Sequence, residues 1–424
     1  MAAIGLDLVF SSSKNPIQTR ITEMKACHLK SILLVLMSSV LLATCSGSGG
    51  PFFASGGIDG SGVISKGSIS AFGSIFVNGT EFDTSNAAIF INGVEIGIGD
   101  EAVRENLDIG RVITVEGIRN EDPNTAVADR VIYSNNVKGP VESISDADAI
   151  TREILVLGQM VVVNAATYFN GTTFDTIAPD DVVEVSGLFD DTGAIWATFI
   201  GKTGGVVPGL EVEVTGYIAN LDPVLQSFEI NGLTVDYALA DTSALPDGMP
   251  AEGLFAEVQG TLDAIGEEMA ASGILLGDEL DADDAGEIEV TGFVTDFVSP
   301  SEFTVGNQPV LTGADTLFVD GTQANVALGV KLEAEGTLVD GVILATEIEF
   351  WGPNQIEVEG FVTDVDSPTE FTIGSRLVQT DSNTVFDGGT PEDIVLGVNL
   401  EVKGVPADTN QSVLFADKVS FEMQ

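Results

Sequence analysis

The chain has 424 residues, 44% of them hydrophobic, enough for several folded domains. It carries 65 acidic against 16 basic side chains, a net charge of −49, which disfavours binding to phosphate backbones and anionic membrane surfaces. Such a surface keeps a protein soluble by self-repulsion, or attracts cations and basic partners. Both cysteines, Cys27 and Cys45, and the one histidine, His28, precede residue 46. This excludes Cys or His chemistry and Cys/His zinc sites from the rest of the chain.

The first 45 residues have the features of a targeting segment. Lys25 and Lys30 form a positively charged start, and residues 31–43 form an apolar run too short to span a membrane comfortably. The run ends in Leu-Ala-Thr-Cys at Cys45. Met24 lies directly before this pattern and is the more natural initiator, so we expect residues 1–45 to be a signal region.

This segment resembles a bacterial lipoprotein signal. The resemblance implies cleavage before Cys45 and lipidation of its thiol, and several acyl chains would give stable anchoring. Ser46 after the cysteine implies sorting to the outer membrane. Thr44 departs from the pattern, which usually has a smaller residue there, so a plain secretory signal is the alternative. Residues 46–62 contain seven Gly and four Ser, a composition typical of a flexible, disordered tether.

In the rest of the chain, three sequence features recur five times in the same order, which chance would not produce. A first strand with alternating apolar residues contains a glycine at Gly67, Gly139, Gly216, Gly292 and Gly360. A later strand ends in a glycine at Gly117, Gly187, Gly260, Gly336 and Gly404. Nine to twelve residues on comes Ala-x-x-Ile/Val, at Ala128/Val131, Ala197/Ile200, Ala271/Ile274, Ala345/Ile348 and Ala416/Val419.

Each repeat is predicted to be all-β, with period-2 strands and Asn-Gly or Ser-Pro turns. A glycine inside a strand is typical of a bulge or a tight bend. Between the third and fourth strands there is room for one helical turn. Five strongly bent strands in some 70 residues predict a small OB-like barrel, so we expect a tandem array of about five five-stranded barrels. The expected boundaries are 63–135, 136–205, 209–280, 286–351 and 355–424.

The links between repeats are short, which favours a semi-rigid row. At the size expected for compact domains of this length, five in line would extend on the order of 140 Å.

The repeats resemble an envelope-protein family of bacteria known as domain of unknown function 5666. The resemblance is carried by GSISAFGSIFVNGTEFDTS from Gly67, by the glycine-ended fourth strands and by Ala-x-x-Ile/Val. It covers about residues 62–424. It implies an envelope protein, often a lipoprotein, and supplies no catalytic residues.

Nothing in the sequence predicts catalysis or a cofactor. No acidic position stands out as a candidate for a glycosidase-like pair, so we expect no enzyme. The densest acidic run, GDELDADDAGE from Gly277, fails as an EF-hand loop because Ala285 and Gly292 occupy two ligand positions. It is either a solvated linker or a weak calcium site formed by Asp281, Asp283 and Asp284.

An aromatic residue follows the first-strand glycine in three repeats, as Tyr217, Phe293 and Phe361. By strict alternation these side chains lie on the outer face and could stack on a ligand. Alternatively, a bulge turns them inward or they pack against a neighbouring repeat. We expect Trp196 and Trp351, at or near the ends of last strands, to pack between repeats.

The sequence therefore predicts a non-catalytic, lipid-anchored envelope protein that acts as a spacer or as a binding or adhesion array. Its expected partners are the membrane, through Cys45, and a polysaccharide or an envelope protein; nucleic acid is not expected. There are two alternatives. The protein is a polysaccharide-binding module that uses the outer faces of the third to fifth repeats, or it is a calcium-stabilised adhesin. We expect the protein in the cell envelope, at the outer membrane, or else free in the periplasm or secreted.

Overall fold

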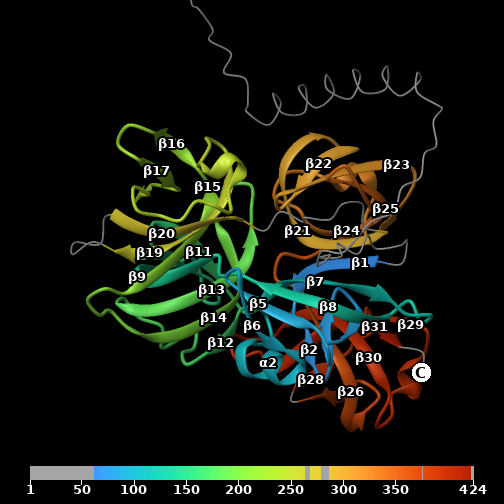
Figure 1. Ribbon diagram of the computed structural model, residues 1–424. Coiled ribbons are helices and arrows are strands. Elements are labelled where there is room, and N and C mark those ends of the chain that lie inside the picture. The colour runs from blue at the N-terminus through green and yellow to red at the C-terminus, as the bar shows by residue number, and fades with distance from the viewer. Residues whose placement is uncertain (1–61, 263–267, 278–285, 375, 422–424) are drawn as a thin grey trace, which may run out of the picture. The chain divides into compact units, whose positions relative to one another are not determined.

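The computed structural model describes residues 62–262, 268–277, 286–374 and 376–421. They form an all-β protein with three sheets of 13, 12 and 6 strands (Figure 1). Within these ranges, no helix has both the length and the apolar character needed to cross a membrane. Cys45, Asp281, Asp283 and Asp284 lie outside the described residues.

The fourth repeat illustrates the topology that all five share. Its strands are β21 (Glu287–Ser299), β22 (Glu302–Val305), β23 (Gln308–Val319), β24 (Lys331–Val339) and β25 (Val342–Trp351). Strands β21, β22 and β23 pair antiparallel in succession, β23 pairs parallel with β25, and β24 pairs antiparallel with both β25 and β21. The ring therefore closes in the order 1-2-3-5-4, and the OB-like five-stranded barrel is confirmed.

The second and fifth repeats close in the same order. The first and third keep this order, but their first strand is broken in two, one part pairing with the fourth strand and the other with the second. The first contains β1 (Gly62–Ser68), β2 (Ala71–Phe72), β3 (Ile75–Val77), β4 (Thr80–Asp83), β5 (Ala88–Ile91), β6 (Val94–Ile98), β7 (Val112–Arg119) and β8 (Thr125–Tyr133). The second contains β9 (Val137–Asp146), β10 (Arg152–Val156), β11 (Gln159–Val163), β12 (Tyr168–Asn170), β13 (Asp181–Phe189) and β14 (Ile195–Gly205). The third contains β15 (Glu211–Tyr217), β16 (Ala219–Asp222), β17 (Ser227–Ile230), β18 (Leu233–Asp236), β19 (Phe255–Leu262) and β20 (Glu268–Leu276). The fifth contains β26 (Ile356–Ser367), β27 (Glu370–Ile373), β28 (Arg376–Gln379), β29 (Val385–Asp387), β30 (Asn399–Pro406) and β31 (Val413–Phe421).

The segment before the fourth strand differs between repeats. In the third, fourth and fifth it holds one short 3-10 turn: η2 (Pro246–Gly248), η3 (Gln323–Asn325) and η4 (Pro391–Asp393). This agrees with the single helical turn that we expected. In the first repeat the expectation is wrong, because an eight-residue helix, α2 (Gly99–Asn106), fills the space and buries Val103 in the core.

The fourth-strand glycine and Ala-x-x-Ile/Val are two halves of one β-bulge. In the fourth repeat Glu335 pairs with Glu347 and Gly336 pairs with Ala345, so Thr346 has no residue opposite it. This extra residue shifts the alternation by one, so that Ala345 and Ile348, three apart, both point into the core. A side chain on Gly336 would collide with the backbone carbonyl of Leu344. The other four repeats have the same shift at the same place.

The first-strand glycine permits a close approach between strands. A Cβ on Gly292 would lie 2.9 Å from Cγ1 of Val305, nearer than side chains tolerate. The barrel can therefore coil tightly at this point, as the sequence predicted.

First strands also join repeats to one another. Strand β1 pairs parallel with β21, joining the first repeat to the fourth (Figure 1). Strand β9 pairs antiparallel with β15, joining the second to the third. The expectation of a row is therefore wrong: strand pairing between the first and fourth repeats requires the chain to return on itself.

Candidate functional site: a pocket where four repeats meet

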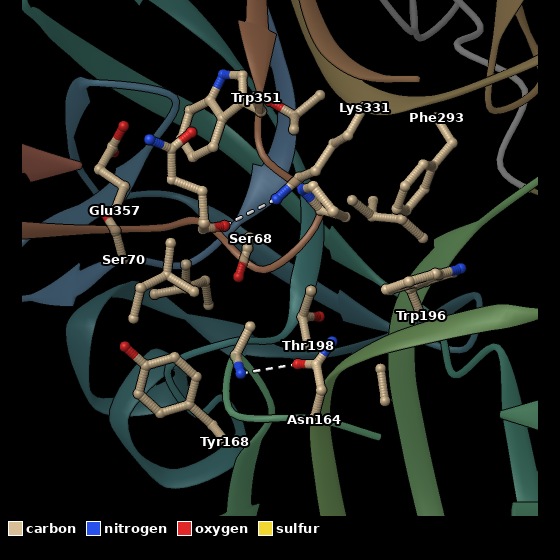
Figure 2. Close-up of a pocket in the computed structure, with 18 of the residues that line it drawn as sticks. Ser68, Ser70, Asn164, Tyr168, Trp196, Thr198, Phe293, Lys331, Trp351 and Glu357 are labelled. Atoms are coloured by element: carbon tan, nitrogen blue, oxygen red, sulfur yellow. Dashed lines mark hydrogen bonds between the residues drawn. The ribbon is translucent and has the colours of Figure 1, made fainter. Parts of the chain in front are cut away.

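A pocket lies between the first, second, fourth and fifth repeats (Figure 2). The pocket itself is small, with a cavity volume of about 70 Å³ for the centre of a water-sized molecule, and it opens into unfilled space that brings the total to about 730 Å³ with solvent included. Short polar side chains contribute much of the lining: Ser68, Ser70, Asn78, Asn164, Thr198 and Thr291. The apolar and aromatic part is Ile69, Ala166, Tyr168, Leu188, Trp196, Ala197, Phe293, Trp351, Pro353 and Ile356. Lys331, Gln355 and Glu357 complete it.

Both tryptophans of the chain line this pocket. The Trp196 ring lies 5.3 Å from the ring of Phe293, centroid to centroid, at a tilt of 41°. Its Nε1 donates a hydrogen bond to Oδ2 of Asp190, which fixes the orientation of the indole. Figure 2 shows Trp196 and Phe293 on one side of the pocket and Tyr168 on the other. The aromatic wall is therefore built by the second and fourth repeats together.

Lys331, at the start of β24, is the one basic residue among the described residues that line the pocket. Its ammonium group donates a hydrogen bond to the backbone oxygen of Gln355 at 3.0 Å and lies 4.9 Å from the centre of the Trp351 ring. Figure 2 shows the amino group between Trp351 and Ser68, with this hydrogen bond dashed. Burial lowers the pKa of Lys331 to about 8, opposed by the negative charges of Glu357 and Glu333.

Glu357, in β26, connects the pocket with a buried charged cluster. Its Oε1 accepts a hydrogen bond from the backbone N–H of Gly79 at 3.2 Å. Its Oε2 makes no hydrogen bond, and the ammonium of Lys403 is 3.8 Å away. Burial raises the pKa of Glu357 to about 7, and the charge of Glu401 adds to the increase.

The charged cluster consists of Glu287, Glu289, Glu333, Glu335, Glu347, Glu349, Glu357 and Glu401 with Arg119, Lys403 and Lys418, from the first, fourth and fifth repeats. Arg119 binds Glu287 at 2.8 Å and Glu289 at 2.5 Å, and Lys403 binds Glu349 at 2.6 Å. Burial raises the pKa of Glu289 to about 7 and that of Glu333 well above its usual range. Burial alone would lower the pKa of Lys403, but the surrounding glutamates raise it.

The three aromatic residues predicted as a stacking surface lie in different environments. Phe293 is 2% exposed and packs against Trp196, which was one of the alternatives for these positions. Tyr217 is 48% exposed and its ring lies 4.9 Å from that of Phe255. Phe361 is 59% exposed. The structure places Phe293 in the pocket wall, whereas the pocket lining does not include Tyr217 or Phe361.

The predicted calcium ligands and lipidation site lie outside the described residues, as noted above. Among the residues that the structure does describe, no group of three or more His, Cys, Asp or Glu side chains is arranged to hold a metal ion.

Most of the pocket was not foreseen, because its residues are spread over four repeats. Lys331, Tyr168 and Asn164 occupy no recurring position. The one available signal was the scarcity of tryptophan, since Trp196 and Trp351 are the only two in the chain. They were expected to pack between repeats, and they lie where repeats meet.

Comparison with known proteins gives a family but no activity. A family model described as "Domain of unknown function (DUF5666)" matches residues 61–132, 138–201, 291–349 and 359–420, together more than half of the chain. The third repeat has the same strand pairing, although the matched residues do not include it.

No curated protein matches. A solved structure titled "drosophila Unr CSD456" is 13% identical, with an alignment that covers 51% of this chain and 99% of that one. Its TM-score of 0.13 is too low to support an argument.

Proposed function

This chain belongs to the DUF5666 family, and we propose that it is a non-catalytic, lipid-anchored protein of the cell envelope that binds a saccharide in the pocket between its repeats. One observation carries the proposal: both tryptophans of the chain, Phe293 and Tyr168 converge there among hydroxyl and amide side chains. Ligand pockets combine apolar walls with a few convergent polar groups in this way.

A saccharide fits these walls because each sugar ring has apolar C–H faces and a rim of hydroxyl groups. An aromatic ring offers an electron-rich face to the C–H groups, and Trp196 and Tyr168 are both partly exposed. Ser, Thr and Asn side chains can both donate and accept hydrogen bonds. Most of those in the lining already donate within the protein, so they would offer a hydroxyl-rich ligand chiefly acceptor lone pairs: Ser70, Asn78, Asn164, Thr198 and Thr291.

We propose a non-catalytic protein because of the side chains that line the pocket. Among the described residues that line it, Glu357 is the one with a carboxyl group. Glycoside hydrolysis ordinarily needs two carboxyl groups, about 5–10 Å apart on either side of the bond. Glu357 is also turned toward Gly79 and Lys403, and this position suits a structural role.

The location follows from the proposed anchor. A lipid on Cys45 would hold the protein at a membrane surface, where envelope polysaccharides are the abundant saccharides. Mass spectrometry of the mature protein tests this part: a free, unmodified Cys45 thiol would contradict the anchor but leave the pocket proposal standing.

Fluorescence of the full chain tests the binding directly, because both indoles line the pocket. We expect saturable quenching or a spectral shift when envelope oligosaccharides are added. Trp196→Phe should remove part of the signal and weaken binding. Phe361→Ala, at an exposed position outside the pocket lining, should bind like the wild type.

The exposure of Tyr217 and Phe361 favours a second candidate, in which saccharide binds to the outer faces of the third and fifth repeats. In that case Tyr217→Ala and Phe361→Ala would weaken binding, and Trp196→Phe would not. If no envelope saccharide binds at all, the protein is better described as a spacer or scaffold.

A further inference from the structure

Lys331 differs from most of the basic residues that the structure describes. Arg111, Arg119, Lys138, Lys202 and Lys403 each contact one or more carboxylates within 4.0 Å. Within the part of the chain that the structure describes, Lys331 has no such ion pair, and its one hydrogen bond goes to a neutral backbone carbonyl. The chain has 65 acidic side chains, yet none of those in the described ranges forms an ion pair with this ammonium group.

The amino group is aimed at the pocket with unused hydrogen-bonding capacity. An ammonium carries three N–H donors, and the bond to Gln355 uses one. The other two have no acceptor among the described residues. Figure 2 shows the amino group reaching in beside Ser68. Thr291 also lines the pocket, and its hydroxyl donates a hydrogen bond to Oδ1 of Asn78.

The charged groups nearby do not neutralise Lys331. The carboxylates whose fields it feels are Glu357 and Glu333, with Lys403 acting in the opposite direction. Burial raises the pKa of Glu357 to about 7, so that around neutral pH it carries less than a full charge, and burial also raises the pKa of Glu333 well above its usual range. The pocket therefore contains a cation whose counter-charge is incomplete.

We propose that Lys331 pairs with an anionic group of the bound saccharide, so that the pocket prefers sugars that carry a carboxylate, as uronic acids do, over neutral sugars. This inference rests on the proposed saccharide function and specifies the ligand class. The ammonium supplies a charge-assisted hydrogen bond to the anion, and the aromatic wall contacts the sugar ring. A phosphate on a sugar would offer the same chemistry to Lys331, and the experiment separates the two.

The experiment compares pairs of ligands in which one member carries an anionic group and the other is neutral. A tetramer of galacturonic acid and its full methyl ester are titrated into the full-length protein at pH 7 and about 0.15 M salt, which screens the long-range repulsion from the acidic surface, with tryptophan fluorescence as the readout. We expect the acid to bind more than tenfold tighter than the ester. Glucose 6-phosphate and glucose form the second pair; a preference confined to this pair would overturn the carboxylate assignment in favour of phosphate.

Variants at position 331 test whether Lys331 causes the preference for the acid over the ester. Lys331→Met should reduce the affinity ratio of acid to ester to about one, and Lys331→Arg should retain a preference because it keeps the charge. Lys202→Met, which removes a lysine paired with Asp181 outside the pocket lining, should leave the ratio unchanged. Circular dichroism establishes that each variant is folded. If the methionine variant does not fold, the pH dependence of the wild type decides: an acid-to-ester ratio that stays constant as the pH rises past about 8 would overturn the role of Lys331.

The outcomes separate the two proposals. Equal binding of acid and ester by the wild type would overturn the role of Lys331 and leave saccharide binding intact. A preference that survives in Lys331→Met would also overturn it. Failure of every saccharide to bind would overturn both. The preference should also weaken as the pH rises past about 8, where Lys331 loses its proton.

Discussion

The second and third repeats are joined differently from the first, fourth and fifth. A single apolar core runs through the second and third, with Val137 and Val214 paired across the junction and both fully buried. The first, fourth and fifth repeats have separate cores, except that Ile64 of the first repeat packs into the core of the fourth. What lies between them is the charged cluster, in which Arg119 and Lys403 are surrounded by glutamates.

We call the contact between the second and third repeats the apolar junction, and the contact among the first, fourth and fifth repeats the charged junction. The stability of the two junctions should depend differently on pH. Burial of aliphatic side chains stabilises by an amount that hardly depends on pH. Buried ion pairs depend on the protonation of their members and on the presence of every partner. One fold repeated five times thus uses apolar packing at one junction and protonation-dependent contacts at another.

The largest effect that we expect is a loss of stability of the charged junction with rising pH. Burial raises the pKa of Glu289 and Glu357 to about 7 from an ordinary value of 4.5, so the folded state holds protons that the unfolded chain releases. Stability should therefore fall between about pH 4.5 and 7 and level off above, by several kcal/mol at roughly 1.4 kcal/mol per unit of pKa shift. Urea titrations at a series of pH values measure this. Stability that rises with pH over the interval would contradict the assignment, and Glu289→Gln should flatten the curve.

The next largest effect should come from removing the cation of this junction. Arg119→Met leaves Glu287 and Glu289 without their partner, and we expect a loss of about 3–5 kcal/mol at pH 7. The loss should be smaller at pH 5, where Glu289 is protonated. Arg130→Met is the matched control, because its pair with Glu116 is exposed to solvent and should contribute about 0–1 kcal/mol. Equal losses of stability in the two variants would show that the ion pairs of Arg119 contribute no more than a solvent-exposed pair does.

The apolar junction should respond more weakly and without a pH dependence. Val214→Ala removes two buried methyl groups, and we expect a loss of about 2 kcal/mol from transfer and cavity terms. The loss should be the same at pH 5 and pH 8. Val224→Ala, at a residue 88% exposed, should change stability by less than about 0.5 kcal/mol. A pH-dependent cost at Val214 would mean that the two junctions are coupled.

The smallest effect should come from Phe361. Its side chain is 59% exposed, so Phe361→Ala should cost less than about 1 kcal/mol. Phe293→Ala, at the same position of the neighbouring repeat, should cost about 3–5 kcal/mol because that ring is buried against Trp196. Thermal unfolding of the two variants measures the difference. Similar costs would indicate that Phe361 is covered by a contact that the structure does not contain.

The sequence was informative where one local rule repeats. The five glycines of the fourth strand and the five Ala-x-x-Ile/Val pairs predicted five units of one fold, and the bulge at Gly336 and Ala345 explains why both recur. The turns were also local: Asn78-Gly79 and Asn231-Gly232 have positive φ at both residues, as two-residue hairpin turns need.

The candidate site was not predictable in the same way. Phe293 and Phe361 lie in nearly identical sequence, yet one is buried and the other exposed, because a tryptophan of another repeat lies against the first. Trp196, Lys331 and Glu357 are far apart in the chain and share no spacing.

The sequence by itself therefore determined the class of fold, the number of repeats and the bulge and turns of each barrel, because these depend on backbone sterics and strand alternation within some 70 residues. The tertiary structure alone decided which repeats touch: β1 beside β21, and β9 beside β15. It also decided which outer faces are buried, and hence where the pocket and the charged cluster form. The physical reason is that outward-facing side chains obey no local rule: their burial and their pKa depend on which other surface covers them.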